Sequence, residues 1–383
     1  MIRAILLTAT LTVLAACGRA PANVGGELNA EGGALAATGI RFLGEGDGTG
    51  FARATTRRDF SFPADHGSHD EFRSEWWYFT GNLDGSGGAH FGFELTFFRI
   101  ALSPAAAARA SAWGANQVWM AHFAVTDVAG KRFATAERFA RGALGLAGAE
   151  ADPFHVWVKD WYVEGLADAT DAHLRVEARN EGMALALKLD AAKPPVAHGD
   201  HGLDAKGPEP GNASYYYSFP RLAASGSVEL DGVATEVSGT AWIDREWSTS
   251  ALSAGVVGWD WFALQLSYGR ELMYYRLRGA AGDTSPFSGG SIVGVGGESR
   301  HLRADDVLLT ARDYWRSERT GVRYPVAWQM EVPSEDIALE VVPYIENQEV
   351  DLAVRYWEGA VHAAGNSGKS QLTGRGYLEL AGY

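Results

Sequence analysis

The stretch Ser74-Glu75-Trp76-Trp77-Tyr78-Phe79-Thr80-Gly81 decides the fold class. Successive side chains of a β-strand point to opposite faces, so Trp76 and Tyr78 would share one face. Glu75, Trp77 and Phe79 would share the other face. Aromatic side chains on both faces predict that both are covered, one by a core and the other by a second layer, a partner domain or a ligand.

Similar short segments, rich in Trp, Tyr, Phe, Val and Leu, recur from residue 60 to the end of the chain. They are Glu75–Leu83, His90–Ile100, Val118–Val128, His155–Leu166, His173–Asn180, Tyr215–Phe219, Ser225–Leu230, Thr235–Trp242, Gly258–Tyr268, Glu271–Arg278, Val322–Val332, Ile337–Val342 and Leu372–Leu380. Asp84-Gly85, Asp231-Gly232 and Tyr268-Gly269 separate neighbouring segments as hairpin turns do. Short strands at this spacing predict an all-β protein of antiparallel sandwiches or barrels with little helix.

Length and composition limit the organisation and the partners. The chain has 383 residues, a formal net charge of −14 and one cysteine. The acidic balance argues against nucleic acid as a partner, and a single cysteine excludes an internal disulfide framework. The length favours two domains, and the Pro- and Gly-rich stretch Ala191–Asn212 predicts the boundary between residues 59–205 and 206–383.

The N-terminus predicts export and anchoring. Residues 1–16 combine Arg3 with a short apolar run and small residues, as a signal peptide does. Leu14-Ala15-Ala16-Cys17 looks like a bacterial lipobox, in which the cysteine is lipidated; the alternative is an ordinary signal with an incidental cysteine. Residues 17–58 would form a flexible tether. Because Gly18 follows Cys17, we expect anchoring to the periplasmic face of the outer membrane of a Gram-negative cell.

The motif Trp242-Ile243-Asp244-Arg245-Glu246 contains the strongest candidates for catalytic residues. Asp244 and Glu246 alternate onto one face, where repulsion raises the pKa of one of them if water is excluded. A carboxylic acid protonated near neutral pH is what proton delivery to an unactivated substrate requires. Downstream, Asp260 is a third candidate acid. The alternative is an ion-pair network of Asp244, Arg245, Glu246 and Asp260 that joins two strands.

Two further acidic positions have structural alternatives. Glu75 among aromatic residues requires a partner, and an ion pair with Arg73 or Arg99 is at least as plausible as a role in the site. His66 and His69, in a loop with two aspartates, fit a polar loop better than a metal site. We therefore expect no metal and no other cofactor.

Several segments together resemble the carotenoid 1,2-hydratase-like, AttH-type family of secreted bacterial proteins. They are Phe62–Gly81, Lys206–Ser218, Asp244–Ser248, Gly258–Leu266, Tyr356–Gly359 and Gly374–Leu380. The resemblance implies two lipocalin-like β-domains, relatives that hydrate isoprenoid double bonds and others that guide cyclisation of polyenes. Many members are described as predicted secreted hydrolases, and some are encoded beside export-type ABC transporters, which makes such a transporter a possible partner. Arg245 stands where the family often has His, and Arg does not shuttle protons.

Hydration of an isoprenoid or lipid is therefore the first functional prediction. Protonation of an alkene leaves a carbocation that aromatic faces stabilise and water captures. The predicted catalytic acids are Asp244, Glu246 and Asp260. The predicted substrate-binding residues are Glu75, Trp76, Tyr78, Trp242, Trp247, Trp259 and Trp261. The alternative is a lipocalin-type carrier of apolar ligands that works with the transporter; a serine hydrolase is disfavoured because no Gly-x-Ser-x-Gly elbow occurs.

Overall fold

A computed structural model describes residues 48–105, 111–166, 172–250 and 252–383. The predicted signal peptide, Cys17 and the larger part of the tether lie outside the described residues. Residues 48–58, expected to belong to the tether, lie against the first sheet: Ala54 is buried, and the amide of Ala52 donates to the carbonyl of Glu71 (2.9 Å). No helix within the described ranges is long and apolar enough to cross a bilayer.

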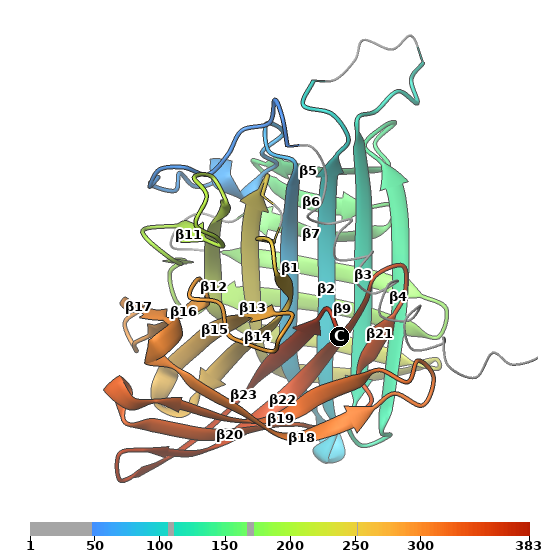
Figure 1. The fold of residues 1–383 in the computed structure, drawn as a ribbon. Helices are drawn as coiled ribbons and strands as arrows, with labels where there is room; N and C mark the ends of the chain where they lie inside the picture. Colours follow the sequence, from blue (N-terminus) through green and yellow to red (C-terminus); the bar gives the residue numbers. More distant parts are fainter. Residues whose placement is uncertain (1–47, 106–110, 167–171, 251) are drawn as a thin grey trace, which may run out of the picture.

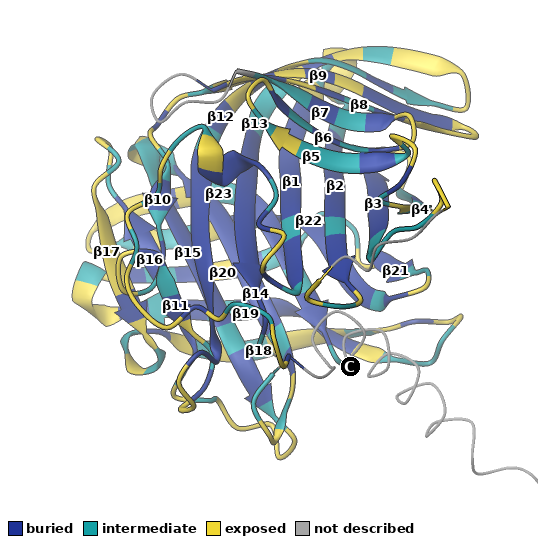
Figure 2. Cartoon of the chain, turned by 90° about the horizontal axis from the view of Figure 1, so that it is seen from above, coloured by how far each residue is buried: buried dark blue, intermediate teal, exposed yellow. Residues whose placement is uncertain are grey.

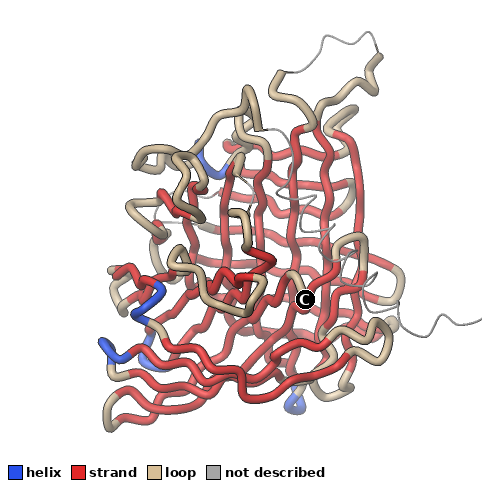
Figure 3. The backbone as a smooth tube through the Cα atoms, in the orientation of Figure 1, coloured by secondary structure: helices blue, strands red, loops and turns tan. Residues whose placement is uncertain are grey.

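Two large antiparallel sheets make up the described fold, which confirms the all-β prediction (Figures 1 and 3). The first sheet has the order β4-β3-β2-β1-β13-β12-β9-β8-β7-β6-β5, with β10 and β11 also paired to β12. Its strands are β1 (Ser74–Gly85), β2 (His90–Ala101), β3 (Gln117–Asp127), β4 (Arg132–Arg141), β5 (Ala147–Ala151), β6 (Phe154–Val158), β7 (Trp161–Leu166), β8 (His173–Asn180), β9 (Met183–Ala191), β10 (Val196–Ala197), β11 (Leu203–Ala205), β12 (Ala213–Leu230) and β13 (Val233–Ser248).

The second sheet has the order β17-β16-β15-β14-β23-β22-β20-β19-β18, with β21 also paired to β22. Its strands are β14 (Val256–Leu266), β15 (Arg270–Gly279), β16 (Gly289–Val293), β17 (Ser299–Arg303), β18 (Leu308–Arg316), β19 (Arg323–Val332), β20 (Ile337–Pro343), β21 (Glu349–Asp351), β22 (Arg355–Ser367) and β23 (Ser370–Ala381). The described helices are short 3₁₀ turns: η1 (Ala64–His66), η2 (Ser86–Gly88), η3 (Ser267–Gly269), η4 (Ala304–Asp306) and η5 (Pro333–Glu335).

The chain passes from one sheet to the other between Ser248 and Val256. The boundary expected at residues 205 and 206 therefore falls inside the first sheet. The stretch Ala191–Asn212 is a loop that contacts both sheets, and it carries the short strands β10 and β11, which pair with β12. The Lys193 ammonium in this loop donates to Glu271 and to the carbonyls of Gly269 and Gly294, each at 2.6 Å.

Each sheet curls around its own core, and a third apolar layer joins them. Trp77 and Phe79 of β1 point into the core of the first sheet, which β5–β9 close from behind (Figure 1). Tyr78 points the other way and packs with Trp261 of β14. The predicted covering of both faces of β1 is thus confirmed, and the cover on the second face is the other sheet.

The two sheets approach each other closely, and the strands at their contact are buried along most of their length (Figure 2). β1 lies against β23, and β2 lies against β22. A side chain at Gly92 of β2 would meet the Ala360 Cβ at 2.5 Å and the Tyr377 hydroxyl at 2.8 Å. Glycine is therefore required there for the sheets to pack.

Candidate active site

A cavity of about 180 Å³ lies between the two sheets. This volume is many times the roughly 10–15 Å³ that one water needs, and its walls are mainly apolar. Its lining residues include Ser74, Trp76, Tyr78, Thr96, Phe98, His122, Lys206, Ser214, Tyr216, Asp244, Glu246, Leu252, Trp259, Trp261, Tyr275, Tyr356 and Glu379. Both halves of the chain contribute, so the cavity exists only when the sheets are packed together.

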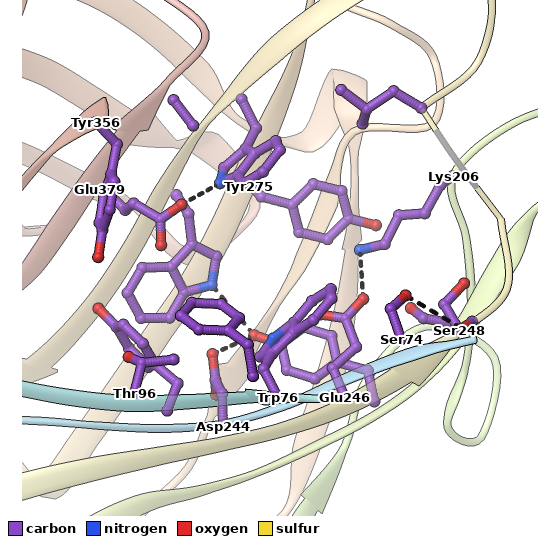
Figure 4. A pocket seen from close by; sticks show the side chains of 18 of the residues that line it. Ser74, Trp76, Thr96, Lys206, Asp244, Glu246, Ser248, Tyr275, Tyr356 and Glu379 are labelled. Carbon is purple, nitrogen blue, oxygen red and sulfur yellow. Dashed lines mark hydrogen bonds and ion pairs between the residues drawn. The ribbon is translucent and has the colours of Figure 1, made fainter. Parts of the chain in front are cut away.

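Asp244, on β13, forms part of the wall from the first sheet (Figure 4). Its carboxylate accepts hydrogen bonds from the Tyr216 hydroxyl (2.6 Å), the Trp242 indole (2.6 Å) and the Ser218 hydroxyl. Burial raises the pKa of Asp244 to about 7, although these three donors oppose the shift. A carboxylate has about four lone-pair positions, so one position remains to accept a proton from water.

Glu246, two residues further along β13, faces the same cavity beside a cation. The Lys206 ammonium lies 3.6 Å from Glu246 and 2.5 Å from Asp204, and 3.8 Å from the ring centre of Tyr275. Burial raises the pKa of Glu246, while Lys206 lowers it. The ion pair with Lys206 favours the charged form and so makes Glu246 a weaker acid candidate than its neighbour.

Glu379, on β23, brings a carboxyl group from the second sheet to the cavity (Figure 4). The indole nitrogen of Trp259 donates to its Oε1 (2.5 Å). Burial raises the pKa of Glu379 to about 7, and the charges of Asp244 and Glu246 add to the shift. The sequence predictions missed this residue. The signal was in Leu378-Glu379-Leu380, where strand alternation sets a lone acid opposite two core leucines.

Four of the predicted aromatic residues line the cavity, namely Trp76, Tyr78, Trp259 and Trp261. A fifth, Trp242, is buried in the layer between the sheets and acts through its hydrogen bond to Asp244.

Three predicted site residues lie elsewhere. Asp260 is turned away from the cavity, where it accepts from Arg276 (2.7 Å) and from the Tyr383 hydroxyl (2.6 Å). Trp247 packs in the first core and stacks on His69 with ring centres 3.8 Å apart. The reason is strand alternation: Asp260 lies between two cavity-lining tryptophans on β14, and Trp247 lies next to Glu246 on β13.

Glu75 is the third of these residues, and it forms a buried ion-pair cluster. It pairs with Arg99 and with Arg245, whose Nη2 lies 2.5 Å from Oε2. Burial opposes ionisation, but the two guanidinium groups outweigh it and hold the pKa of Glu75 well below its usual range. The predicted pair of Glu75 with Arg99 is confirmed. The alternative network of Arg245 with Asp244, Glu246 and Asp260 is wrong, because Arg245 points to the opposite face of β13.

Within the described ranges no group of three or more His, Cys, Asp or Glu side chains is arranged to hold a metal ion. The histidines of the predicted polar loop are engaged with protein groups: His69 lies 3.0 Å from Asp65, and His66 lies 2.6 Å from the Tyr217 hydroxyl.

The fold and the site together define a class of protein: two curled antiparallel sheets with an aromatic, acid-bearing cavity between them. The AttH-like family model matches residues 53–383, so the chain belongs to the AttH-like family. An AttH protein from Nitrosomonas europaea has a crystal structure with a TM-score of 0.76 and 34% sequence identity, covering 87% of this chain and all of that one. The resemblance predicted from sequence is confirmed.

Two named enzymes are also similar to this chain. Kievitone hydratase from Nectria haematococca shares the fold with a TM-score of 0.65 at 15% identity, covering 87% of this chain and 96% of its own. The dehydratase asqC from Emericella nidulans is 23% identical over 196 residues, which are 48% of this chain. This chain covers 53% of that dehydratase, about half of its length.

Proposed function

We propose that the protein is a hydratase or dehydratase, which adds water to, or removes it from, an isoprenoid or similar apolar molecule held between the two sheets. The observation that carries the proposal is the pair Asp244 and Glu379. These two carboxyl groups contact one aromatic cavity from opposite sheets, and each has a pKa raised to about 7. Similarity to a hydratase and a dehydratase supports the same reaction class.

The hydrogen bonds assign a role to each carboxyl group. Glu379 has one oxygen occupied by Trp259, so its protonated form can direct the other oxygen to a double bond. Asp244 is held by three donors, which favour its anion and leave one lone pair for water. Glu379 therefore acts as the general acid and Asp244 as the general base.

The reaction balances with these two groups. Glu379 transfers its proton to one alkene carbon, and the other carbon becomes cationic. The faces of Trp259 and Trp261 stabilise the cation, and water forms the new C–O bond while Asp244 takes its proton. Glu379 is then ionised and Asp244 protonated, and the same groups in these states carry out the reverse elimination.

Incubation of the purified protein with acyclic isoprenoids in ¹⁸O-labelled water tests the proposal. We expect labelled alcohol by mass spectrometry, and none with heat-denatured protein. Ligand bound without label uptake across a broad substrate panel would favour the lipocalin-type carrier instead.

We also propose that lipidated Cys17 holds the protein at the outer membrane, close to a source of apolar substrates. The support is the lipobox-like sequence before the single cysteine. A triacylated cysteine supplies more than one acyl chain, which is sufficient for stable anchoring.

A further inference from the structure

The cavity is also lined by a histidine, His122, which has no role in the sequence predictions or in the proposed chemistry. His122 lies on β3, is 1% exposed, and sits between the rings of Phe98 and Tyr356. Its Nδ1 is 2.7 Å from the Tyr356 hydroxyl, while its Nε2 is buried and has no hydrogen-bond partner among the described residues.

Neighbouring groups determine which nitrogen of the His122 ring carries the proton. The Tyr356 hydroxyl has no other acceptor among the described hydrogen bonds, so it donates to Nδ1 of His122. Burial lowers the pKa of His122 to about 3, which keeps the ring neutral. A neutral ring that accepts at Nδ1 carries its proton on Nε2. His122, a residue that lines the cavity, therefore has an N–H donor without a partner among the described residues.

A second buried histidine shows that the fold can satisfy such a ring. His198, also 1% exposed, has Nε2 2.6 Å from the Ser218 hydroxyl and Nδ1 3.0 Å from the Ser291 hydroxyl. Both of its nitrogens have protein partners. A buried donor without a partner is costly, so the free donor of His122 is explained if a ligand supplies the acceptor.

We propose that the Nε2–H of His122 binds an oxygen atom of the substrate, a carbonyl or a hydroxyl oxygen. The inference rests on the proposed function and narrows its substrate class to a compact isoprenoid that already carries oxygen. Figure 4 places Tyr356, the partner of His122, near Glu379 and away from Lys206 and Glu246. The substrate oxygen thus anchors one end of the molecule beside the general acid.

The first test uses the ligand-free protein. Side-chain ¹⁵N NMR of the full chain, with His122→Gln to assign the signal, reports the tautomer of His122. We expect a neutral ring protonated at Nε2 from pH 5 to pH 8. A ring protonated at Nδ1, or a charged ring, would overturn the assignment of the donor.

The second test measures whether the protein binds a ligand with an oxygen atom more tightly than one without it, and it requires no catalytic turnover. The probes are β-ionone, a compact isoprenoid ketone, and the hydrocarbon of the same skeleton that lacks the ketone oxygen. Binding is followed by tryptophan fluorescence. One buried hydrogen bond predicts that the wild type prefers the ketone by about tenfold, and that the preference is lost in His122→Phe.

His198→Gln is the matched control, because it changes a buried histidine that does not line the cavity, and it should keep the tenfold preference. Equal affinity of the wild type for the two probes, or a preference that survives in His122→Phe, would refute the role of His122. Failure of the hydratase proposal can be distinguished from failure of this inference. In the first case ¹⁸O uptake would be absent while the preference for the ketone remained.

Discussion

The effect of Glu379→Gln on protein stability tests whether Glu379 is protonated in the folded protein. The pKa of Glu379 is raised from 4.5 to about 7, mainly by burial. The folded protein therefore holds a proton that the unfolded chain releases, and the stabilisation is fully present below pH 4.5 and lost as the pH rises through 7. Gln has nearly the same shape and still accepts from Trp259, but it has no proton to release.

The magnitude follows from the size of the shift. A change of 2.5 pKa units at about 1.4 kcal/mol per unit gives about 3–4 kcal/mol, of which about 2–3 kcal/mol falls between pH 5 and pH 8. Other buried carboxyl groups also titrate in this range, so the difference between variant and wild type isolates Glu379. Relative to the wild type, the variant should gain about 2–3 kcal/mol of stability from pH 5 to pH 8.

Urea unfolding at the two pH values, followed by tryptophan fluorescence, measures this difference. Glu318→Gln is the control, because Glu318 is exposed on the surface, and it should change stability equally at both pH values. If Glu379→Gln also shifts stability equally at pH 5 and pH 8, Glu379 is ionised throughout and is not the general acid.

Three other changes give separate predictions. Cys17→Ser should abolish incorporation of labelled palmitate and release the protein from membranes; equal labelling of both proteins would disprove the lipid anchor. Glu75→Gln should lower the free energy of unfolding by about 3–5 kcal/mol, because Arg99 and Arg245 stay buried without their carboxylate; a loss under about 1 kcal/mol in chemical denaturation would show that the cluster is weak. Lys193→Ala should cost about 2–3 kcal/mol by leaving three acceptors on the second sheet without their donor, and an unchanged melting temperature would contradict this.

The regular alternation of large side chains made many of the strands predictable, and the lack of this alternation explains two of the strands that were missed. Phe262, Leu264 and Leu266, which are every second residue of β14, point into the second core, so β14 was expected from its pattern. β22 and β16 are rich in Gly, Ala and Ser, whose small side chains give no clear alternation.

Turn chemistry was readable at two of the three expected hairpin turns, whereas Asp84 and Gly85 lie at the end of β1. Asp231 and Gly232 both have positive φ, as a two-residue hairpin turn requires. By contrast, Tyr215–Phe219 and Ser225–Leu230 were expected as two strands and form one, β12, which an irregularity between Phe219 and Leu222 interrupts. A bulge changes the side-chain pattern locally, as a loop would.

Only part of the site could be predicted from sequence. Alternation within one strand correctly set Asp244 and Glu246 on the same face. It could not reveal which face meets the other sheet, and so Asp260 and Trp247 were included although they point away. Glu379 and His122 are more than a hundred residues from Asp244 along the chain, and only the packing of the sheets brings all three to one cavity.

Label uptake by matched variants tests the central claim most directly. Wild type, Asp244→Asn, Glu379→Gln and Asp260→Asn are each incubated with the same oxygenated isoprenoid alkene in ¹⁸O-labelled water, and folding is checked by circular dichroism. We predict labelled product from the wild type and from Asp260→Asn, and a loss of at least about a hundredfold in Asp244→Asn and Glu379→Gln while ligand binding persists. Label uptake that survives both cavity substitutions would contradict acid–base catalysis between the sheets.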